Sequence, residues 1–139
     1  MYYKIIGYTG TSTRIKLPST YAGLLVLEIG EKAFQGNKTI TEETIPSSIT
    51  TIGKYAFQNC TNLTTINIPS TMVTIGTSTF VGRNNLKNVD TTKAVNLTTI
   101  EAGAFAGCTT MESFVISSSV ATINGYVFYA CTKMAIYSY

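Results

Sequence analysis

Residues Ile49–Met72 read ITTIGKYAFQNCTNLTTINIPSTM, and this stretch sets the pattern for most of the chain. Its central phrase, IGKYAFQNC, begins at Ile52 and occurs in altered form four more times. The phenylalanines of the copies are spaced 23, 23, 25 and 23 residues apart, at Phe34, Phe57, Phe80, Phe105 and Phe128. A regular period in this range is typical of a solenoid, in which short repeats stack into one continuous core.

Each repeat divides into three pieces. Ile49–Ile52 is short and rich in β-branched residues, which favours a strand. Lys54–Cys60 is too short for an independent helix, so it predicts a helical or 3₁₀ turn with Phe57 facing inward. Leu63–Pro69 alternates apolar and polar residues, which indicates a strand with Ile66 and its apolar neighbours buried and the polar residues exposed.

The two ends of the chain differ from the five repeats. Tyr2–Tyr8 and Thr13–Leu17 are two strand-like runs around a Gly/Thr/Ser turn, which predicts an N-terminal hairpin cap within residues 1–23. The sequence stops within the last strand of the fifth repeat, and no polar capping segment follows it. Because solenoids need capped ends, we expect either a continuation of the chain or end-to-end self-association at the C-terminal coil.

The composition narrows the class of protein. The 139 residues are sufficient for a single domain spanning 1–139, and only 12% of them are charged. The net charge of +3 is scattered, so the basic surface of a nucleic-acid-binding protein is not expected. The longest apolar run, Leu24–Leu27, is far too short to span a membrane. The chain begins without an apolar targeting segment, so the sequence fits either a cytoplasmic protein or a mature or trimmed form of an exported one.

The cysteines follow the repeat. Cys60, Cys108 and Cys131 all lie three residues after the repeat phenylalanine, and Asn37 and Arg83 take this position in the other repeats. A residue at a fixed phase indicates a packing role, because cysteine behaves as a small buried apolar residue. A disulfide between Cys108 and Cys131 is the alternative.

Two departures from the repeat pattern stand out. Glu43 takes a position that Ile66, Val89 and Phe114 occupy in later repeats, so either its strand is displaced or its carboxylate reaches solvent. The third repeat has Thr92 in place of proline, and two extra residues follow. These predict a loop around residues 93–95, and tolerance of insertions at a surface turn explains it more simply than a ligand contact.

The residue inventory argues against an enzyme. The chain contains no histidine, so a Ser-His-Asp or Cys-His arrangement is excluded. The adjacent carboxylates Glu42 and Glu43 would point to opposite faces of a strand. No cysteine pair has metal-ligand spacing, and no phosphate-binding loop is present. We therefore expect no catalytic residues, no metal and no cofactor.

The five copies together resemble a known family. The segments Gly7–Phe34, GYTGTSTRIKLPSTYAGLLVLEIGEKAF, and Ile45–Gly76, IPSSITTIGKYAFQNCTNLTTINIPSTMVTIG, are similar to BspA-type leucine-rich repeats, also called the Treponema pallidum type. The resemblance implies a β-rich right-handed superhelix of about five coils of 23 residues, with a parallel sheet built by Leu63–Pro69 and its counterparts. It also implies an extracellular or cell-surface location, and a role in adhesion, by analogy with relatives that bind matrix proteins or cells.

These observations predict a non-enzymatic binding module whose exposed strand face recognises a protein or a glycan. The expected binding face consists of the outward residues of three successive strands: Thr64, Thr65, Asn67, Lys87, Asn88, Asp90, Glu112, Ser113 and Val115. A structural spacer without intrinsic binding is the alternative function. Tyr126, Tyr129 and Ile136 suggest a further aromatic contact patch, although packing against a following repeat explains them as well.

Overall fold

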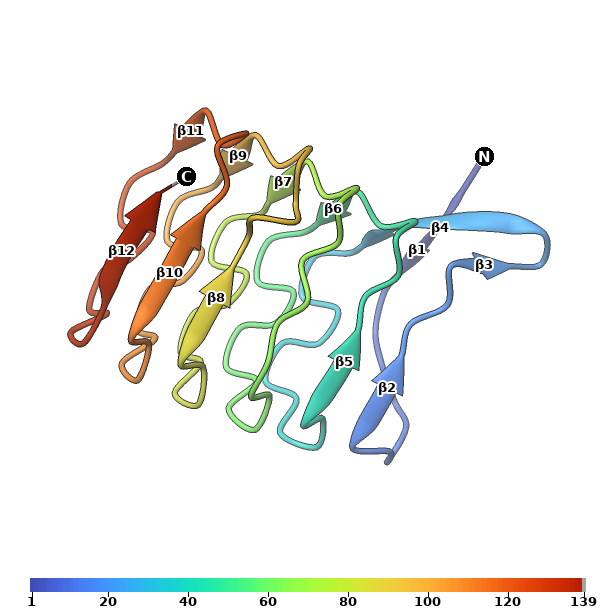
Figure 1. Ribbon diagram of the computed structural model, residues 1–139. Coiled ribbons are helices and arrows are strands. Elements are labelled where there is room, and N and C mark those ends of the chain that lie inside the picture. Colours follow the sequence, from blue (N-terminus) through green and yellow to red (C-terminus); the bar gives the residue numbers. More distant parts are fainter. Residues whose placement is uncertain (139) are drawn as a thin grey trace.

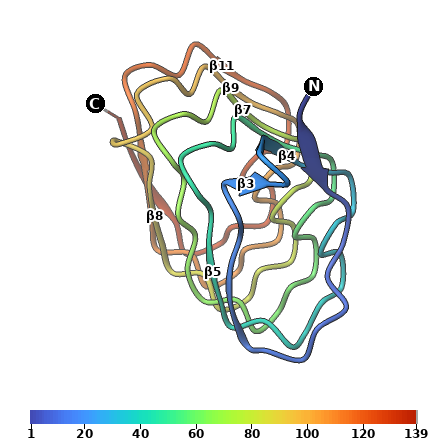
Figure 2. The same cartoon turned by 90° about the vertical axis from the view of Figure 1, so that its right-hand side faces the viewer.

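The chain forms a β-solenoid, and the computed structural model describes residues 1–138 and the side chains of 1–135. Successive coils lie side by side along one axis, and their strands form one long sheet and two shorter ones (Figure 1). Viewed along the axis, the coils superimpose as closed loops around a common interior (Figure 2). The predicted solenoid with parallel strands is therefore confirmed.

The first sheet is formed by the short strand at the start of each coil. In spatial order it contains β1 (Tyr3–Ile5), β4 (Leu24–Ile29), β6 (Thr51–Ile52), β7 (Thr74–Ile75), β9 (Thr99–Ile100) and β11 (Thr122–Ile123). All of these neighbours pair in parallel. The register places each buried isoleucine on the isoleucine of the next coil, as in Ile52 opposite Ile75. This alignment forms a ladder of like side chains in the core.

The second set of strands is divided into two parts. On one side, β2 (Arg14–Lys16) pairs with β5 (Glu42–Thr44); on the other, β8 (Asn88–Asp90), β10 (Ser113–Ile116) and β12 (Ala135–Ser138) form a three-stranded sheet. Between them, Leu63–Ile68 crosses without forming a regular strand, as the green segment of Figure 1 shows. We call the outer surface over β2, β5, residues 63–68, β8, β10 and β12 the strand face.

The predicted N-terminal hairpin is wrong. β1 and β2 do not pair with each other: β1 pairs in parallel with β4, and β2 pairs in parallel with β5. The N-terminal segment thus adds an irregular coil to the stack, and each of its two strands pairs with a strand of the next coil. The hairpin that does form joins β3 (Thr20–Tyr21) to β4 through Ala22 and Gly23, whose positive φ angles of 47° and 79° suit a tight two-residue turn.

The third side of each coil is a six-residue turn, and the five turns together form what we call the turn face. The turns cover residues 31–36, 54–59, 77–82, 102–107 and 125–130. Alternate N–H groups of each turn donate to carbonyls of the next coil: Tyr55 donates to Thr77, Phe57 to Thr79 and Asn59 to Val81. The same three bonds join every pair of successive turns, with N···O distances of 2.7–3.0 Å. All donors point toward the C-terminal end, and we call this pattern the turn row.

The expected helical character of these turns is also wrong, since no residue of the turn face is helical. Each turn contains two residues with positive φ, placed two before and two after the phenylalanine. In the second repeat these are Tyr55 (58°) and Asn59 (57°), and in the fourth they are Gly103 (66°) and Gly107 (72°). A left-handed residue at every fourth position breaks a helix and turns alternate N–H groups in one direction.

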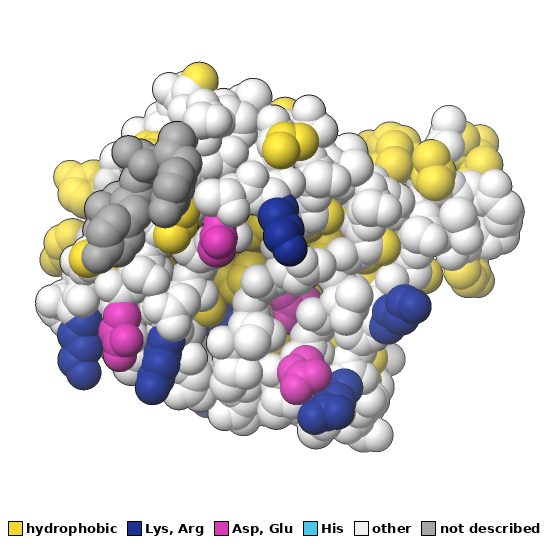
Figure 3. All heavy atoms as spheres, viewed as in Figure 1, with side chains coloured by type: hydrophobic (Ala, Val, Ile, Leu, Met, Phe, Trp, Pro, Cys, Tyr) yellow, Lys and Arg dark blue, Asp and Glu magenta, His cyan; other side chains and the backbone are white. Residues whose placement is uncertain are grey.

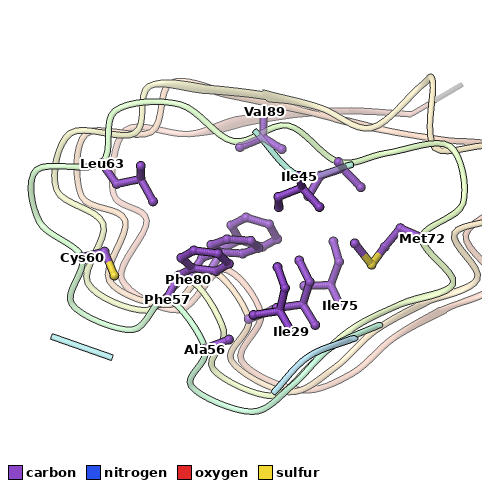
Figure 4. Close-up of a cluster of buried hydrophobic side chains, with 14 of the residues drawn as sticks. Ile29, Ile45, Ala56, Phe57, Cys60, Leu63, Met72, Ile75, Phe80 and Val89 are labelled. Carbon is purple, nitrogen blue, oxygen red and sulfur yellow. The ribbon is translucent and has the colours of Figure 1, made fainter. Parts of the chain in front are cut away.

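A stack of phenylalanines fills the core. Phe34, Phe57, Phe80 and Phe105 are fully buried, and their ring centroids are 5.0, 5.7 and 5.2 Å apart with interplanar angles of 1°, 10° and 22°. Figure 4 shows Phe57 and Phe80 lying one over the other, with Ile29 and Ile75 forming a parallel ladder beside them. Tyr8 extends the stack beyond Phe34 at 6.2 Å. Each buried ring contributes roughly 1.5–3 kcal/mol through removal of apolar surface from water.

Truncating one ring of the stack should lower stability strongly. Phe57→Ala leaves a cavity between two rings that cannot close it, so we expect a loss of about 3–5 kcal/mol in the free energy of unfolding. Urea denaturation checks this value, and Phe105→Ala should behave alike. Lys54→Ala, at an exposed position in the same turn, serves as the control. A Phe57→Ala protein as stable as the control would refute the role of the stack.

Candidate functional site

The strand face carries the residues that the sequence assigned to binding. The outward residues Thr64, Thr65, Asn67, Lys87, Asn88, Asp90 and Glu112 are exposed, and Ser113 and Val115 are partly exposed. They lie over residues 63–68, β8 and β10, so three successive coils bring them onto one surface. The structure thus brings these residues together, and their role in binding stays a prediction.

This surface is dominated by uncharged polar groups. In Figure 3 most of the strand face is white, with a few charged side chains of both signs, among them the ion pair of Arg14 and Glu42 at 3.4 Å. Ser113 donates a hydrogen bond to Asn88 at 2.7 Å, and Asp90 accepts bonds from the amide and hydroxyl of Thr92 at 2.8 and 2.6 Å. These bonds lower the pKa of Asp90, which therefore stays ionised. Lys87 forms no ion pair with any described residue, so its ammonium group is available to a partner.

A groove of about 530 Å³ opens on this face between the second and third coils. It is lined by Thr64, Thr65, Ile66, Asn85, Lys87 and Asn88. Four of these residues belong to the predicted face, whereas Asn85 and Ile66 do not. Ile66 was expected in the core, but it is only partly buried and forms part of the groove wall. Asn85 lies in the loop before β8, where its side chain donates to the carbonyl of Thr61 at 2.7 Å.

The groove coincides with an interruption of the parallel ladder. Among the described residues, no backbone hydrogen bond joins Thr64–Ile68 to β8, and one bond, from Thr64 to Thr41 at 3.4 Å, joins it to the first coil. The next coils, in contrast, pair regularly through β8 and β10. The seam between the second and third coils is thus closed on the other two sides of the solenoid and left open on the strand face.

Arg83 contacts the interrupted segment. It occupies the cysteine position of the repeat, and its side chain is completely buried. Cysteines at this position donate to the carbonyl of the repeat phenylalanine one coil earlier, as Cys60 does to Phe34 at 3.0 Å. The longer arginine instead reaches the carbonyls of Leu63 (2.7 Å) and Thr65 (3.3 Å). Its guanidinium therefore supplies donors to two backbone carbonyls of the irregular segment 63–68.

Glu43 is the second buried charge, and it lies near the first. Contrary to the alternatives drawn from sequence, its strand is not displaced and its carboxylate does not reach solvent: Glu43 is 6% exposed and pairs in register with Ile15. Burial raises the pKa of Glu43 to about 7, and the positive charge of Arg83 limits the rise. Burial likewise lowers the pKa of Arg83, and Glu43 opposes that shift. The two departures from the repeat are therefore electrostatic partners.

The partnership is not a direct ion pair. No Glu43–Arg83 contact falls within salt-bridge distance, and both carboxylate oxygens and Nη1 of Arg83 are buried without a hydrogen-bond partner among the described residues. Such incompletely satisfied charges are costly in a protein interior. The two charges thus weaken the strand face on either side of the second coil.

The cysteines have the structural role predicted for them. All three are free thiols, and each donates to the carbonyl of the phenylalanine one coil earlier: Cys60 to Phe34, Cys108 to Phe80 and Cys131 to Phe105, at 3.0–3.3 Å. Cys60 and Cys108 are buried, and Cys131 is partly exposed in the last coil. Within the described residues no group of three or more potential metal ligands occurs.

The stacked parallel coils define a leucine-rich-repeat solenoid. The sequence profile of the BspA type leucine-rich repeat region matches residues 8–135 in six copies, so the chain belongs to this family. The sixth copy agrees with the irregular N-terminal coil. Leucine-rich-repeat solenoids generally serve as protein-interaction modules. No helix in the part of the chain described here is long and apolar enough to cross a membrane.

Solved structures share the fold. A leucine-rich repeat protein of T. pallidum is 20% identical, with a TM-score of 0.60, and the match covers 93% of this chain and 81% of that one. The pneumococcal vaccine antigen PcpA is 18% identical, with a TM-score of 0.76, over 98% of this chain and 33% of that one. A leucine-rich cell surface protein of Faecalibacterium prausnitzii is 24% identical, with a TM-score of 0.59, over 97% and 50%. No curated protein sequence matches the chain significantly.

The Glu43–Arg83 partnership should appear in a double-mutant cycle at pH 8, where Glu43 is ionised. Glu43→Ile leaves a buried cation without its partner and Arg83→Cys leaves a buried anion, so each should cost about 3–5 kcal/mol. The double variant restores the repeat pattern and should be as stable as the wild type or more stable, by up to about 4 kcal/mol. Urea denaturation measures all four proteins. Single costs that simply add in the double variant would disprove the coupling.

The stability of the protein should also fall as pH rises from 5 to 7.5. Because the pKa of Glu43 is about 7 when folded and 4.5 when unfolded, the folded state holds the proton more tightly. Its contribution is fully present below the unfolded pKa and is lost as pH rises through the folded pKa, and the part lost between pH 5 and 7.5 is about 2.4 kcal/mol. The difference between wild type and Glu43→Gln in urea denaturation at the two pH values isolates this residue. Parallel pH dependences of the two proteins would contradict the assignment.

Proposed function

We propose that the chain is a non-enzymatic binding module of a cell-surface or secreted protein, and that its strand face recognises a protein or a glycan. The location is supported by the family membership and by the cell-surface description of the F. prausnitzii protein that shares the fold. Solenoids of stacked repeats typically bind partners on such extended surfaces.

The observation that carries this proposal is the groove at the open seam. Its lining combines the hydroxyls of Thr64 and Thr65, the amides of Asn85 and Asn88 and the ammonium of Lys87 around the apolar side chain of Ile66. Backbone groups of Thr64–Ile68 that form no ladder bond to β8 add further donors and acceptors beside it. A surface with few convergent polar groups around an apolar centre is suited to recognition.

The strand face carries exposed charges of opposite sign near the groove. Lys87 lies at the groove just before β8, and Asp90 is the last residue of β8, so exposed groups of opposite sign stand at the two ends of this strand. A partner that spans β8 therefore meets a positive and then a negative group. Such an arrangement contributes mainly to the specificity of an encounter and to its rate.

Reversing both charges should weaken binding at least tenfold. The experiment measures Lys87→Glu/Asp90→Lys against a panel of immobilised extracellular-matrix proteins and glycans, and against host cells, by surface plasmon resonance and cell adhesion. Loss is expected because each reversed group would face a like charge on the partner, and tenfold in Kd corresponds to about 1.4 kcal/mol. The net charge of the protein is unchanged by the pair of substitutions.

The matched control reverses two charges on the turn face. Glu31→Lys/Lys32→Glu exchanges an exposed ion pair (3.9 Å) and should leave binding intact. Equal binding by wild type and the Lys87/Asp90 variant would remove the strand face as the binding surface. Absence of wild-type binding to every member of the panel would instead favour the spacer role.

A further inference from the structure

Residues 63–68, which form one wall of the groove, are held in place mainly by side chains. They cross between β5 and β8 without forming a strand (Figure 1). On the side of the first coil, the side-chain amide of Asn67 donates to the carbonyl of Ile45 at 3.2 Å. On the side of the third coil, Arg83 donates to the carbonyl of Thr65 and to one further carbonyl of the segment. Because few backbone bonds fix this segment, a change in the groups that hold it can move it.

Glu43 lies on β5, the strand beside this segment, and its carboxylate is unusual. Both of its oxygens are buried without a hydrogen-bond donor among the described residues, and so is Nη1 of Arg83 without an acceptor. Burial raises the pKa of Glu43, whereas the guanidinium of Arg83 and the backbone N–H groups of Glu43 and Asn67 lower it. Asn67 belongs to the groove wall, and Arg83 is bonded to it. The groups outside β5 that favour ionised Glu43 are therefore the groups that position the wall.

The other titratable groups around Glu43 keep their charge near neutral pH. Its neighbour in register on β2 is the apolar Ile15. The other charged side chains of β2 and β5 are exposed on the strand face: Arg14, Lys16 and Glu42. Cys60 also acts on this region, but burial raises its pKa to about 11, so it stays a neutral thiol. Residues 63–68 contain no titratable side chain. A change of charge beside the segment near neutral pH therefore comes from Glu43.

We propose that the protonation state of Glu43 sets the position of residues 63–68 and, with it, the width of the groove. The described arrangement suits the neutral acid, because unpartnered buried oxygens cost less free energy without a charge. The ionised carboxylate draws in the N–H of Asn67 and Nη1 of Arg83, since hydrogen bonds to a charged acceptor are shorter and stronger. Residues 63–68 then move toward β5 and away from β8, which widens the groove.

This movement makes the groove sensitive to pH. Lys87 and Asn88 form the opposite wall at β8, which pairs regularly with β10 and stays in place. Because the pKa of folded Glu43 is about 7, the narrow form predominates at pH 5.5 and the wide form at pH 8. The consequence for binding rests on the proposed function of the groove, whereas the movement of the segment does not.

The first test follows the free protein by NMR and needs no partner. Between pH 5.5 and 8, the amide signals of residues 65–67 should titrate with the same midpoint as the side-chain carboxyl carbon of Glu43. The exchange protection factor of the Asn67 N–H should rise at least tenfold, because it gains an acceptor. Glu43→Gln, which keeps the shape of the neutral acid, should show neither change. Glu42→Gln is the matched control, since it removes an exposed carboxylate from the same strand and should titrate like the wild type.

The second test measures binding to the panel of matrix proteins and glycans by surface plasmon resonance at both pH values. The Kd of the wild type should be at least threefold higher at pH 8, because one wall has moved away, and Glu43→Gln should remove this difference. A wild-type Kd that is equal at both pH values would overturn the regulation of binding.

The two tests separate this inference from the proposed function. Amide signals of residues 65–67 that do not follow Glu43 in the wild type would overturn the movement and leave the proposed function intact, and this result does not require the variant to fold. Signals that titrate unchanged in Glu43→Gln would also overturn it. A segment that titrates as expected in a protein that binds no member of the panel would support the movement and contradict the proposed function.

Discussion

The structure depends on the turn row, in which alternate N–H groups of every turn donate to the next coil. This pattern requires left-handed residues two positions before and two positions after each core phenylalanine. The twelve bonds that result fix the spacing between coils, and that spacing brings the phenylalanine rings to within 5.0–5.7 Å of each other in the first four full coils. The Phe stack and the row therefore stabilise each other. The two extra residues of the third repeat leave both intact, because they lie in the loop between β8 and β9 and anchor it through buried Ala94.

With the coils held together on the turn face and by the first sheet, the strand face tolerates irregularity. The seam between the second and third coils lacks its ladder bonds, yet β6 still pairs with β7, and Tyr55, Phe57 and Asn59 still donate across it. Arg83 and Glu43 are both buried here, and the pairing on the other two sides of the coils offsets the free-energy cost of burying charges. The groove lies where the ladder bonds between residues 64–68 and β8 are missing. The guanidinium of Arg83 binds two carbonyls of the irregular segment, and the strand face has a groove at this seam.

Much of the architecture could be predicted from the period of the sequence, but its local geometry could not. The phase of Phe57 and Cys60 is a strong signal because core positions tolerate few residue types. The left-handed positions give a weak signal, since Lys32, Tyr55, Ser78 and Tyr126 stand where glycine would have revealed them. The pairing of β1 with β4 was missed because the sequence favours local hairpins and does not show which distant strand pairs more extensively.

The exposure of the strand face was predicted in outline for a related reason, and its binding role stays a prediction. Outward residues such as Asn88 and Asp90 follow from strand alternation around buried Val89, whereas Ile66, in a segment that forms no regular strand, is only partly buried. Glu43 and Arg83 each depart from the repeat, but they are 40 residues apart in sequence, and only the stacking of three coils brings their charges together. A compensating pair of departures across neighbouring repeats is the signal that could have identified the seam.

Amide hydrogen exchange of dilute protein tests the turn row most directly, because Phe57, Phe80 and Phe128 occupy the same position in three coils and differ in their hydrogen bonds. The N–H groups of Phe57 and Phe80 donate across the stack, at 3.0 and 2.8 Å, and that of Phe128 has no acceptor among the described residues. We predict strong protection of Phe57 and Phe80, approaching the global free energy of unfolding, and rapid exchange of Phe128. If Phe57 and Phe80 exchanged as fast as Phe128, the row would not hold the coils together.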